Sequence, residues 1–441
     1  MEDRAPVKAH IVIAGGGVLG LSVALHAARK FDSLTEPVLL LDKGGLGAGS
    51  SIRSGAVLSA NSKAREYVGM ARDSLRTYRD LGRMTGRTVG FRNTGVLSIF
   101  GPAQQKEIEE LRRDMAMQRS IGVNIKEVGP AEIRLLAPGA VVADGTVGAY
   151  EPDAGIVDPR QTLEVFSTLA RSAGATVRMG SEIQELIVED GRVAGVRTSR
   201  GEIRTQCVVL TAGPWTASLL KRFDVETDLK TLRPSYLYLS MPGDPLKEGA
   251  EGDDLSSTDY RRKDELGLLG SANADRDLDE EIEHAQGSQP EFLPSHPVIY
   301  DYEHDFYAKP NPQHRRTRIS RLDSSLHPAV TDPGNFDHDV SEEACADLRE
   351  RLMRRLPEYG QQERMGTETN LVCAMPDGRG LIGPTEQLPG LFVITGFMGK
   401  DFNLAPSIGE GVAQMLSDEP VSAFTPAFFS PSRLSQPAGK R

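Results

Sequence analysis

The chain has 441 residues, 39% of them hydrophobic and 26% charged, so at ~150 residues per domain it can form about three domains or two larger ones. This composition excludes a fibrous, disulfide-stapled or globally disordered protein, and three scattered cysteines favour a reducing, cytoplasmic compartment. The net charge of −11, of which residues 244–291 supply −10, disfavours nucleic acid as a partner.

The first predicted elements are a strand, a glycine turn and a helix. Residues 10–14 are apolar, and the turn has Gly15 for its tight bend, Gly17 for the approach of a pyrophosphate and Gly20 for packing of helix on strand. A second apolar run ends in Asp42, twenty-two residues after Gly20, where a carboxylate can bind a ribose diol. The pattern predicts a dinucleotide site without separating FAD from NAD.

A loop of small residues follows Asp42 and extends to Gly55. Its glycines and serines offer backbone and hydroxyl donors, so it can wrap the far side of a pyrophosphate and continue beneath an isoalloxazine ring. An ordinary surface loop has little reason to be so long and so small, and the loop therefore favours FAD. The cofactor contacts expected here are Lys43, Gly49, Ser50, Ser51, Arg53 and Ser54.

The middle of the chain predicts a continuation of the same sheet. Asp158 opens a helix, residues 191–198 form a predicted hairpin, and a buried strand ends at Ala212 and Gly213. Trp215, the only tryptophan, either fills the core or lies beside a cofactor.

Near the carboxyl end, a predicted strand at residues 391–395 leads through a second glycine turn into a helix with apolar residues at helical spacing. A helix amino-terminus stabilises negative charge, which suits the pyrimidine edge of a flavin that receives a hydride. A plain strand-to-helix crossover has the same pattern, so the assignment depends on the amino-terminal motif as well.

Together these motifs resemble the D-amino-acid oxidase type of flavoprotein, in the branch of sarcosine oxidases, dimethylglycine dehydrogenases and glycine oxidases, from the first strand to about Leu416. The resemblance implies an α/β fold: a doubly wound FAD-binding domain of the glutathione-reductase-like Rossmann type, and a second substrate domain built on a largely antiparallel sheet. The expected division is residues 1–90, 151–226 and 366–429 for the FAD-binding domain, residues 91–150 and 227–365 for the substrate domain, an acidic surface insertion at 243–289, and a flexible tail at 430–441.

The resemblance also implies further contacts with FAD. Ile183 takes the place where the family meets adenine, and a turn next to the nucleotide comprises Ala212, Gly213 and Trp215. The flavin edge is expected at Gly399, Lys400, Asp401, Phe402 and Asn403.

One departure from the family concerns the substrate carboxylate. Asn403 replaces a lysine that holds this carboxylate in some relatives, so Lys400 is a candidate for the positive charge unless it is an exposed loop lysine. Arg53, Arg92, Tyr307 and Asn403 are further candidate substrate-binding residues, although an arginine on a strand, such as Arg92, more often lies outside.

A second departure concerns the electron acceptor. In oxidase members a lysine over the flavin assists O2 reduction, and the expected register places Tyr307 there, with Lys309 two residues on. Tyr307 and Lys400 are therefore the candidate catalytic residues, and the acceptor is either O2 or a quinone or electron-transfer flavoprotein. The alternative is that Tyr307 is a cavity wall and Lys309 a surface charge.

Neither a covalent bond to FAD nor a metal site is expected. Some sarcosine-oxidase-like members tether FAD through a cysteine, but Cys373 lies closer to Asp377 than in those relatives, so non-covalent FAD and a buried cysteine are expected. No metal site is expected, because the histidines and acids of residues 296–304 lack ligand spacing and predict a solvated turn.

The predicted reaction is oxidation of a primary or secondary amine, or of an (N-methyl) amino acid, to an imine by hydride transfer to flavin N5. Two alternatives stay open: a 2-hydroxy-acid dehydrogenase, which needs a base beside the flavin, and a non-catalytic flavoprotein assembly or scaffold factor, with the insertion at 243–289 as a docking segment. Residues 11–28 are uncharged and approach the length of a membrane span, but glycines break them, so no transmembrane segment is expected.

Overall fold

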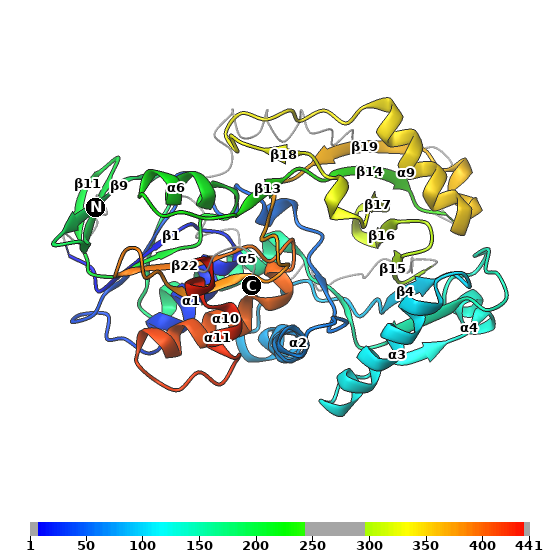
Figure 1. The fold of residues 1–441 in the computed structure, drawn as a ribbon, viewed down its shortest axis with the longest axis horizontal. Coiled ribbons are helices and arrows are strands. Elements are labelled where there is room, and N and C mark those ends of the chain that lie inside the picture. The colour runs from blue at the N-terminus through cyan, green and yellow to red at the C-terminus, as the bar shows by residue number, and fades with distance from the viewer. Residues whose placement is uncertain (1–7, 243–295, 436–441) are drawn as a thin grey trace.

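The computed structural model of the chain describes residues 8–242 and 296–435. They form two halves that lie side by side in Figure 1, each built on its own sheet. In the first half, six strands lie in the order β21, β22, β12, β1, β2 and β8, parallel except for the pair β21 and β22. These strands are β1 (Ile11–Ala14), β2 (Val38–Leu41), β8 (Thr176–Arg178), β12 (Val208–Leu210), β21 (Leu381–Pro384) and β22 (Leu391–Thr395).

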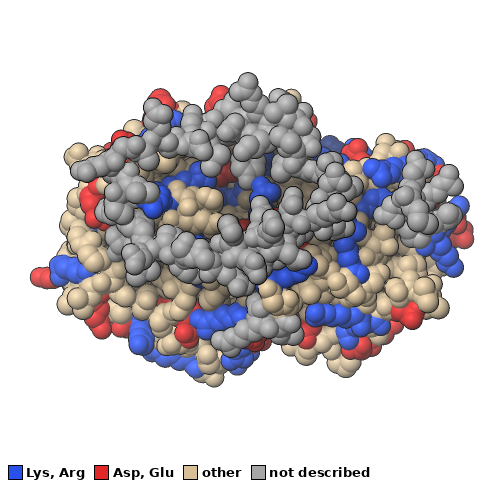
Figure 2. Space-filling view, turned by 180° about the vertical axis from the view of Figure 1, so that it is seen from behind, with Lys and Arg blue, Asp and Glu red and all other residues tan. Residues whose placement is uncertain are grey.

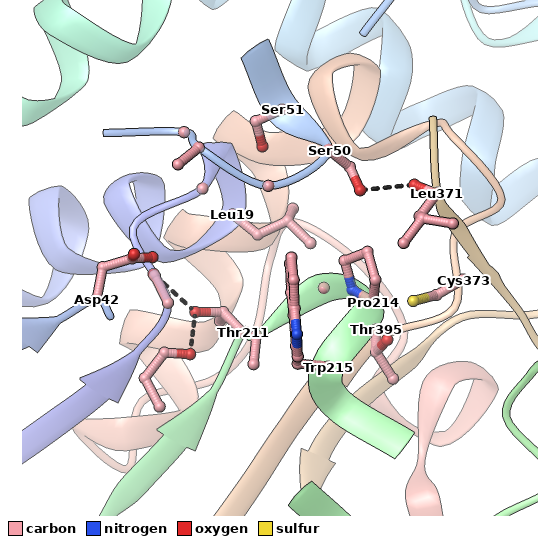
Figure 3. A pocket seen from close by; sticks show the side chains of 18 of the residues that line it. Leu19, Asp42, Ser50, Ser51, Thr211, Pro214, Trp215, Leu371, Cys373 and Thr395 are labelled. Carbon is pink, nitrogen blue, oxygen red and sulfur yellow. Dashed lines mark hydrogen bonds between the residues drawn. The ribbon is translucent and has the colours of Figure 1, made fainter. Parts of the chain in front are cut away.

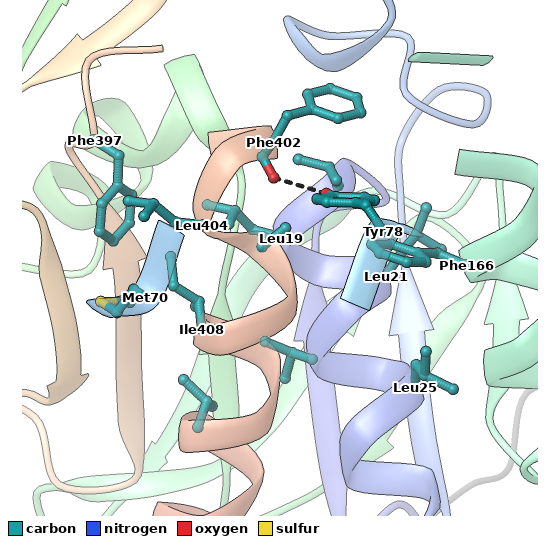
Figure 4. Close-up of a cluster of buried hydrophobic side chains, with 14 of the residues drawn as sticks. Leu19, Leu21, Leu25, Met70, Tyr78, Phe166, Phe397, Phe402, Leu404 and Ile408 are labelled. Atoms are coloured by element: carbon teal, nitrogen blue, oxygen red, sulfur yellow. Dashed lines mark hydrogen bonds between the residues drawn. The ribbon is translucent and has the colours of Figure 1, made fainter. Parts of the chain in front are cut away.

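Helices cover one face of this sheet. Leu19 and Leu25 of α1 and Ile408 of α10 belong to one buried cluster, and the Tyr78 hydroxyl of α2 donates a hydrogen bond of 2.7 Å to the Phe402 carbonyl oxygen (Figure 4). This bond ties α2 to the first turn of α10. The helices are α1 (Val18–Ala28), α2 (Arg65–Thr85), α5 (Pro159–Ser172), α10 (Asp401–Leu416) and, at the edge of the sheet, α11 (Pro426–Phe429).

The other face of the six-stranded sheet is covered by a smaller antiparallel sheet and one short helix. Apolar side chains of both, such as Val196 and Leu220, share a buried cluster with Val12 and Leu39 of the central strands. The covering elements are β9 (Ile183–Glu189), β10 (Arg192–Thr198), β11 (Gly201–Arg204) and α6 (Thr216–Arg222).

The second half is an eight-stranded sheet in the order β19, β14, β17, β16, β15, β4, β6 and β5, antiparallel except for the pair β15 and β4. Its strands are β4 (Val96–Phe100), β5 (Lys126–Val128), β6 (Val147–Glu151), β14 (Ser235–Ser240), β15 (Val298–Asp301), β16 (Phe306–Asn311), β17 (Arg316–Ser320) and β19 (Arg364–Thr369). The helices of this half are α3 (Gln105–Ser120), α4 (Pro130–Leu136) and α9 (Glu342–Arg355).

Side chains alternate between the two faces of this second sheet. Leu237, Ile319 and Ala308 share a buried cluster with residues of α9, so the side chains of the intervening positions, including Tyr238 and Arg318, lie on the opposite face. Two small sheets complete the described fold: β3 (Val57–Leu58) with β7 (Gly155–Ile156), and β13 (Lys230–Leu232) with β18 (Ala329–Val330) and β20 (Val372–Ala374).

The predicted α/β class, with a mainly parallel sheet and a mainly antiparallel one, is confirmed. The exact domain limits stay a prediction, and the acidic insertion at 243–289 lies outside the described residues. The expected loose tail is wrong for its first part: the 3-10 helix Pro431–Ser435 is docked, because the Arg433 guanidinium donates to Asp377 at 2.9 Å and to the Gly380 carbonyl oxygen at 3.0 Å.

The expected solvated turn at residues 296–304 is also wrong. Asp301 is fully buried and accepts a hydrogen bond of 2.6 Å from Arg355, which also donates 2.6 Å to Glu303. His296 is buried as well, with Nε2 2.7 Å from the Tyr359 hydroxyl. Burial of opposite charges with multiple hydrogen bonds makes this cluster an ion pair of the fold, in which the Arg355 guanidinium binds one oxygen of each carboxylate.

No helix in residues 8–242 and 296–435 is long and apolar enough to cross a membrane. On the face turned away from the viewer in Figure 1, basic and acidic side chains are interspersed among uncharged ones (Figure 2).

Candidate cofactor cavity and adjoining substrate face

The turn between β1 and α1 borders a cavity, and glycines occupy its most crowded points. Gly15 has a φ of +126°, and a Cβ atom there would lie 2.4 Å from the carbonyl oxygen of Thr211. A Cβ atom on Gly20 would lie 1.9 Å from the carbonyl oxygen of Gly15, so α1 packs directly on the turn. Because α1 begins at Val18 and Gly17 also lines the cavity, the positive end of the helix faces that space.

Asp42 holds this turn from the end of β2. Its carboxylate oxygens accept hydrogen bonds from the backbone N–H groups of Gly16 at 2.6 Å and Gly44 at 2.7 Å. Each oxygen accepts one of these bonds and keeps acceptor capacity for a hydroxyl in the cavity.

The loop of residues 43–55 forms another wall, and hydroxyl groups hold it in place. The Ser50 hydroxyl donates to the Leu371 carbonyl oxygen at 2.6 Å, and the backbone N–H of Val18 donates to the Ser51 hydroxyl at 3.1 Å. The serines therefore connect the loop both to α1 and to the segment that precedes β20.

These segments enclose a cavity of about 390 Å³. In Figure 3, Trp215 stands in the middle of the lining residues, with Asp42 and Thr211 on one side and Ser50 and Cys373 on the other. The predicted cofactor contacts that line the cavity are Gly15, Gly17, Asp42, Lys43, Gly49, Ser50, Ser51, Ser54, Ile183, Ala212, Gly213, Trp215, Gly399, Asp401 and Phe402.

Of the two interpretations of Trp215, the structure favours the one beside the cavity. The residue is half-buried at the end of the 3-10 helix Gly213–Trp215, and the Lys43 ammonium lies 4.0 Å from its ring centroid. A Cβ atom on Gly49 would lie 3.2 Å from the ring, so the loop packs closely beside the indole.

The turn into α10 forms the other end of the cavity. Gly399, Asp401 and Phe402 line it together with Cys373 from β20. Burial raises the pKa of Asp401 to about 6. Burial, with a contribution from Asp401, raises the pKa of the Cys373 thiol to about 12, so at neutral pH this cysteine holds little of the nucleophilic thiolate.

The two predicted substrate-binding residues near the start of α10, Lys400 and Asn403, do not line the cavity. The Lys400 ammonium lies 4.9 Å from the ring centroid of Tyr67. Asn403 clamps the backbone of Ser59: its amide nitrogen donates to the Ser59 carbonyl oxygen at 2.7 Å, and its amide oxygen accepts from the Ser59 N–H at 3.1 Å. Asn403 is therefore occupied by the fold.

The two predicted arginines are not brought to the cavity either. Arg53 is exposed, and its guanidinium donates to the carbonyl oxygens of Ala48 at 3.3 Å and Gly49 at 3.1 Å. Arg92 exchanges backbone hydrogen bonds with Ile156 and lies outside the lining. Gly20 belongs to the first turn of α1, where it packs on the Gly15 carbonyl oxygen, and it does not line the cavity.

A buried arginine that the sequence did not single out lies next to the cavity wall. Arg318 on β17 is 6% exposed, and its Nη1 donates a hydrogen bond of 2.7 Å to the Arg53 carbonyl oxygen. Its guanidinium lies 3.6 Å from the ring centroid of Tyr236, and Glu368 Oε2 lies 3.7 Å from Nη2. Among the described residues, Nε and Nη2 find no hydrogen-bond acceptor. Glu368 is within ion-pair range of Nη2 but too far for a hydrogen bond, so both nitrogens can still donate to a further anion.

Tyr307 and Lys309 lie on the same sheet face as Arg318, on the neighbouring strand β16. Tyr307 packs against the cavity loop, because a Cβ atom on Gly55 would lie 2.5 Å from its hydroxyl oxygen. The Lys309 ammonium donates to the Gly55 carbonyl oxygen at 2.6 Å and is 6% exposed as a residue, so the interpretation as a surface charge is wrong. Burial, with Arg318 nearby, lowers the pKa of Lys309 to about 7.

This low pKa predicts a stability that rises with pH. Below about pH 7 the folded and unfolded chains both carry the lysine proton, and the cost of burying the charge is fully present. Between about 7 and the ordinary lysine pKa of 10.5 only the unfolded chain holds the proton, so the free energy of unfolding increases with pH. We expect Lys309→Met to lose this increase, measured as the difference between urea midpoints at about pH 7 and about pH 9.5.

Lys126, an exposed lysine on β5, supplies the matched control. In Lys126→Met the urea midpoints at the two pH values are expected to differ as much as they do in wild type. An equal pH difference in wild type and Lys309→Met would contradict the assignment of the rise to Lys309.

The comparisons with known proteins agree on one family. The family described as FAD dependent oxidoreductase matches residues 10–415. 4-Methylaminobutanoate oxidase (formaldehyde-forming) of Paenarthrobacter nicotinovorans is 24% identical over 431 residues, which are 97% of this chain and 45% of that protein. The pyruvate dehydrogenase phosphatase regulatory subunit of Mus musculus is 28% identical over 214 residues, 48% of this chain and 24% of that protein. The chain thus spans less than half the length of these relatives.

Among solved structures, L-proline dehydrogenase from P. horikoshii has a TM-score of 0.78 at 19% identity, and the match covers 98% of this chain and 99% of that chain. At this level of identity the likeness establishes the fold.

Proposed function

The chain belongs to the FAD dependent oxidoreductase family, and we propose that it oxidises an amine that carries a carboxylate, a primary or N-methylated amino acid, to the imine. The observation that carries this proposal is a pair of Arg318 nitrogens, Nε and Nη2, that have no hydrogen-bond acceptor among the described residues and are buried beside the wall of the cavity. A carboxylate is the planar anion that a guanidinium binds best, through two parallel hydrogen bonds.

The cavity fits FAD by its own chemistry. Gly15 and Gly20 leave space that a Cβ atom would fill, the positive end of α1 faces the cavity, and Asp42 retains acceptor capacity for a ribose. These features suit the ADP half of a dinucleotide. When bound, FAD supplies the acceptor for a hydride from the substrate carbon.

The side chains of the substrate face then have distinct tasks. Arg318 holds the carboxylate and thereby fixes the position of the neighbouring carbon–hydrogen bond. The positive charge of Arg318, joined by that of Lys309 below about pH 7, disfavours a charged substrate ammonium and favours the neutral amine that is oxidised. Tyr236 and Tyr307 supply apolar walls that exclude water from the same space.

We propose that FAD is held without a covalent bond. The support is the raised pKa of the Cys373 thiol, about 12, which leaves little thiolate to attack a flavin methyl group. Acid precipitation tests this: a yellow supernatant is expected, and colour that stays with the pellet would overturn non-covalent binding.

A non-catalytic role is the second candidate. Its support is the likeness of half the chain to a protein of Mus musculus that is named as a regulatory subunit and not as an oxidoreductase. A 2-hydroxy-acid dehydrogenase is a weaker candidate, because no histidine is among the described residues that line the cavity and could act as the base.

Anaerobic mixing of the yellow holoprotein with three substrate classes tests the proposal. N-methyl amino acids are expected to bleach the flavin, whereas 2-hydroxy acids and the same amines without a carboxylate are not. Bleaching by hydroxy acids alone supports the dehydrogenase, and no bleaching by any class supports the regulatory role. Readmission of air then distinguishes acceptors, since rapid return of colour indicates O2 and slow return a quinone or electron-transfer flavoprotein.

A further inference from the structure

Asp401 is a carboxylate at the cavity end of α10 for which the proposed reaction has no task. It is the first residue of the helix and lines the cavity with Gly399 and Phe402. The described residues offer its carboxylate no hydrogen-bond donor other than its own backbone N–H. Burial without a partner disfavours the ionised form, and the positive end of α10 only partly compensates.

No described charge near Asp401 neutralises it. From β20 it faces Cys373, a thiol that burial keeps neutral. The ammonium of Lys400, one residue earlier, lies over the ring of Tyr67 on α2, and the Tyr67 hydroxyl accepts a hydrogen bond from the Gly380 N–H. The strands β3, β21 and β22 and the first two turns of α1 contribute no titratable side chain at all.

The position of Asp401 in the cavity determines which part of the cofactor it meets. The glycine turn and Asp42 suit the ADP half, so an extended dinucleotide carries its redox ring to the opposite end, where Gly399, Asp401 and Phe402 lie. Hydride transfer adds one negative charge to that ring. Asp401 is half-buried, and a second negative charge in the same cavity is unfavourable because water screens it only in part.

We propose that Asp401 takes up a proton from solvent when the bound flavin is reduced, so that reduction binds one proton more than the ring alone requires. This inference rests on the proposed function, in which the cavity holds FAD. The electrons and the hydride come from the substrate, the proton comes from water, and the carboxylate becomes a neutral carboxyl group. Reoxidation of the flavin returns the proton to solvent.

The pH range follows from the carboxyl group. In the protein alone the pKa of Asp401 is about 6. The negative charge on the reduced ring is expected to raise this pKa further. Between these two values the midpoint potential is expected to fall by about 59 mV per pH unit, because a tenfold change in K is about 30 mV for two electrons and two protons are bound. Below about pH 6 the carboxyl group is already neutral, and the slope is about 30 mV per pH unit.

The test is the midpoint potential of bound FAD, measured against reference dyes from about pH 5.5 to about pH 8.5 in wild type, Asp401→Asn and Glu182→Gln. Glu182→Gln is the matched control, because it removes a carboxylate from the same cavity near Ile183, at the opposite end. For Asp401→Asn we expect the midpoint potential to fall with pH at one constant slope. For wild type and Glu182→Gln we expect this slope to double above about pH 6. Wild-type potentials should then lie below those of Asp401→Asn at high pH and meet them at low pH.

If the wild-type midpoint potential falls by only about 30 mV per pH unit over the whole pH range, reduction binds one proton per two electrons, and the proposal is overturned. This result does not require the variant to fold, and it leaves FAD binding intact. A wild-type protein that holds no flavin instead overturns both the proposed function and this inference, so the two failures are distinguishable.

Discussion

Replacing Arg318 by methionine is expected to lower kcat/KM for an N-methyl amino acid roughly 100-fold or more, mainly through KM. The variant removes the two guanidinium donors that have no acceptor within the described residues. Hydrogen bonds from a charged donor contribute about 1.5–3 kcal/mol each, and about 1.4 kcal/mol is a factor of ten. Steady-state kinetics with the holoprotein measures the change.

Two controls separate carboxylate binding from a general disturbance. Arg316 lies two residues away on the same strand face, 4.1 Å from the ring centroid of Tyr238. Arg316→Met is expected to lower kcat/KM by less than about tenfold. Arg318→Lys keeps the charge and is expected to recover part of the lost affinity. Unchanged KM in Arg318→Met, or an equal loss in both methionine variants, would remove Arg318 from the substrate site.

Gly15→Ala is expected to give a protein that is purified without flavin and is destabilised by about 2–4 kcal/mol. The alanine Cβ would lie 2.4 Å from the Thr211 carbonyl oxygen, and the φ of +126° is one that side chains rarely adopt. Relief of this clash moves the turn away from β12 and disturbs the wall that the pyrophosphate is proposed to meet. Flavin absorbance per chain and urea unfolding measure the two effects.

Gly45→Ala is the matched control within the same region. A Cβ atom on Gly45 meets nothing within 4 Å, so this variant is expected to keep its flavin and its stability. Full retention of FAD in Gly15→Ala would show that the cofactor does not depend on this turn.

The sequence predicts which residues meet at the proposed nucleotide end because the determinants of that end are local. Gly15, Gly17 and Gly20 lie within one turn, and Asp42 ends the next strand of the same sheet, so spacing alone brings them together. The grouping of Gly399, Asp401 and Phe402 at the other end of the cavity is also predictable, since the three residues belong to a single strand-to-helix connection.

The substrate face could not be predicted in the same way, because it depends on pairing between distant strands. The alternation around Arg318 and Ile319 indicates opposite faces, but only the pairing of β17 with β14 and β16 shows that Arg318 faces the cavity loop. The ion pair of Asp301 and Arg355 joins residues 54 positions apart, which is why the sequence alone predicts a solvated turn at residues 296–304. Asn403 likewise meets Ser59 across 344 positions.

The most direct measurement of the central claim, that this cavity binds FAD, uses the single tryptophan of the chain. Trp215 stands among the cavity residues, so its fluorescence reports only on this site. FAD added to flavin-free protein is expected to quench most of that emission, with saturation at one FAD per chain, because flavin absorbs where tryptophan emits. Undiminished Trp215 emission in the presence of excess FAD would contradict the account.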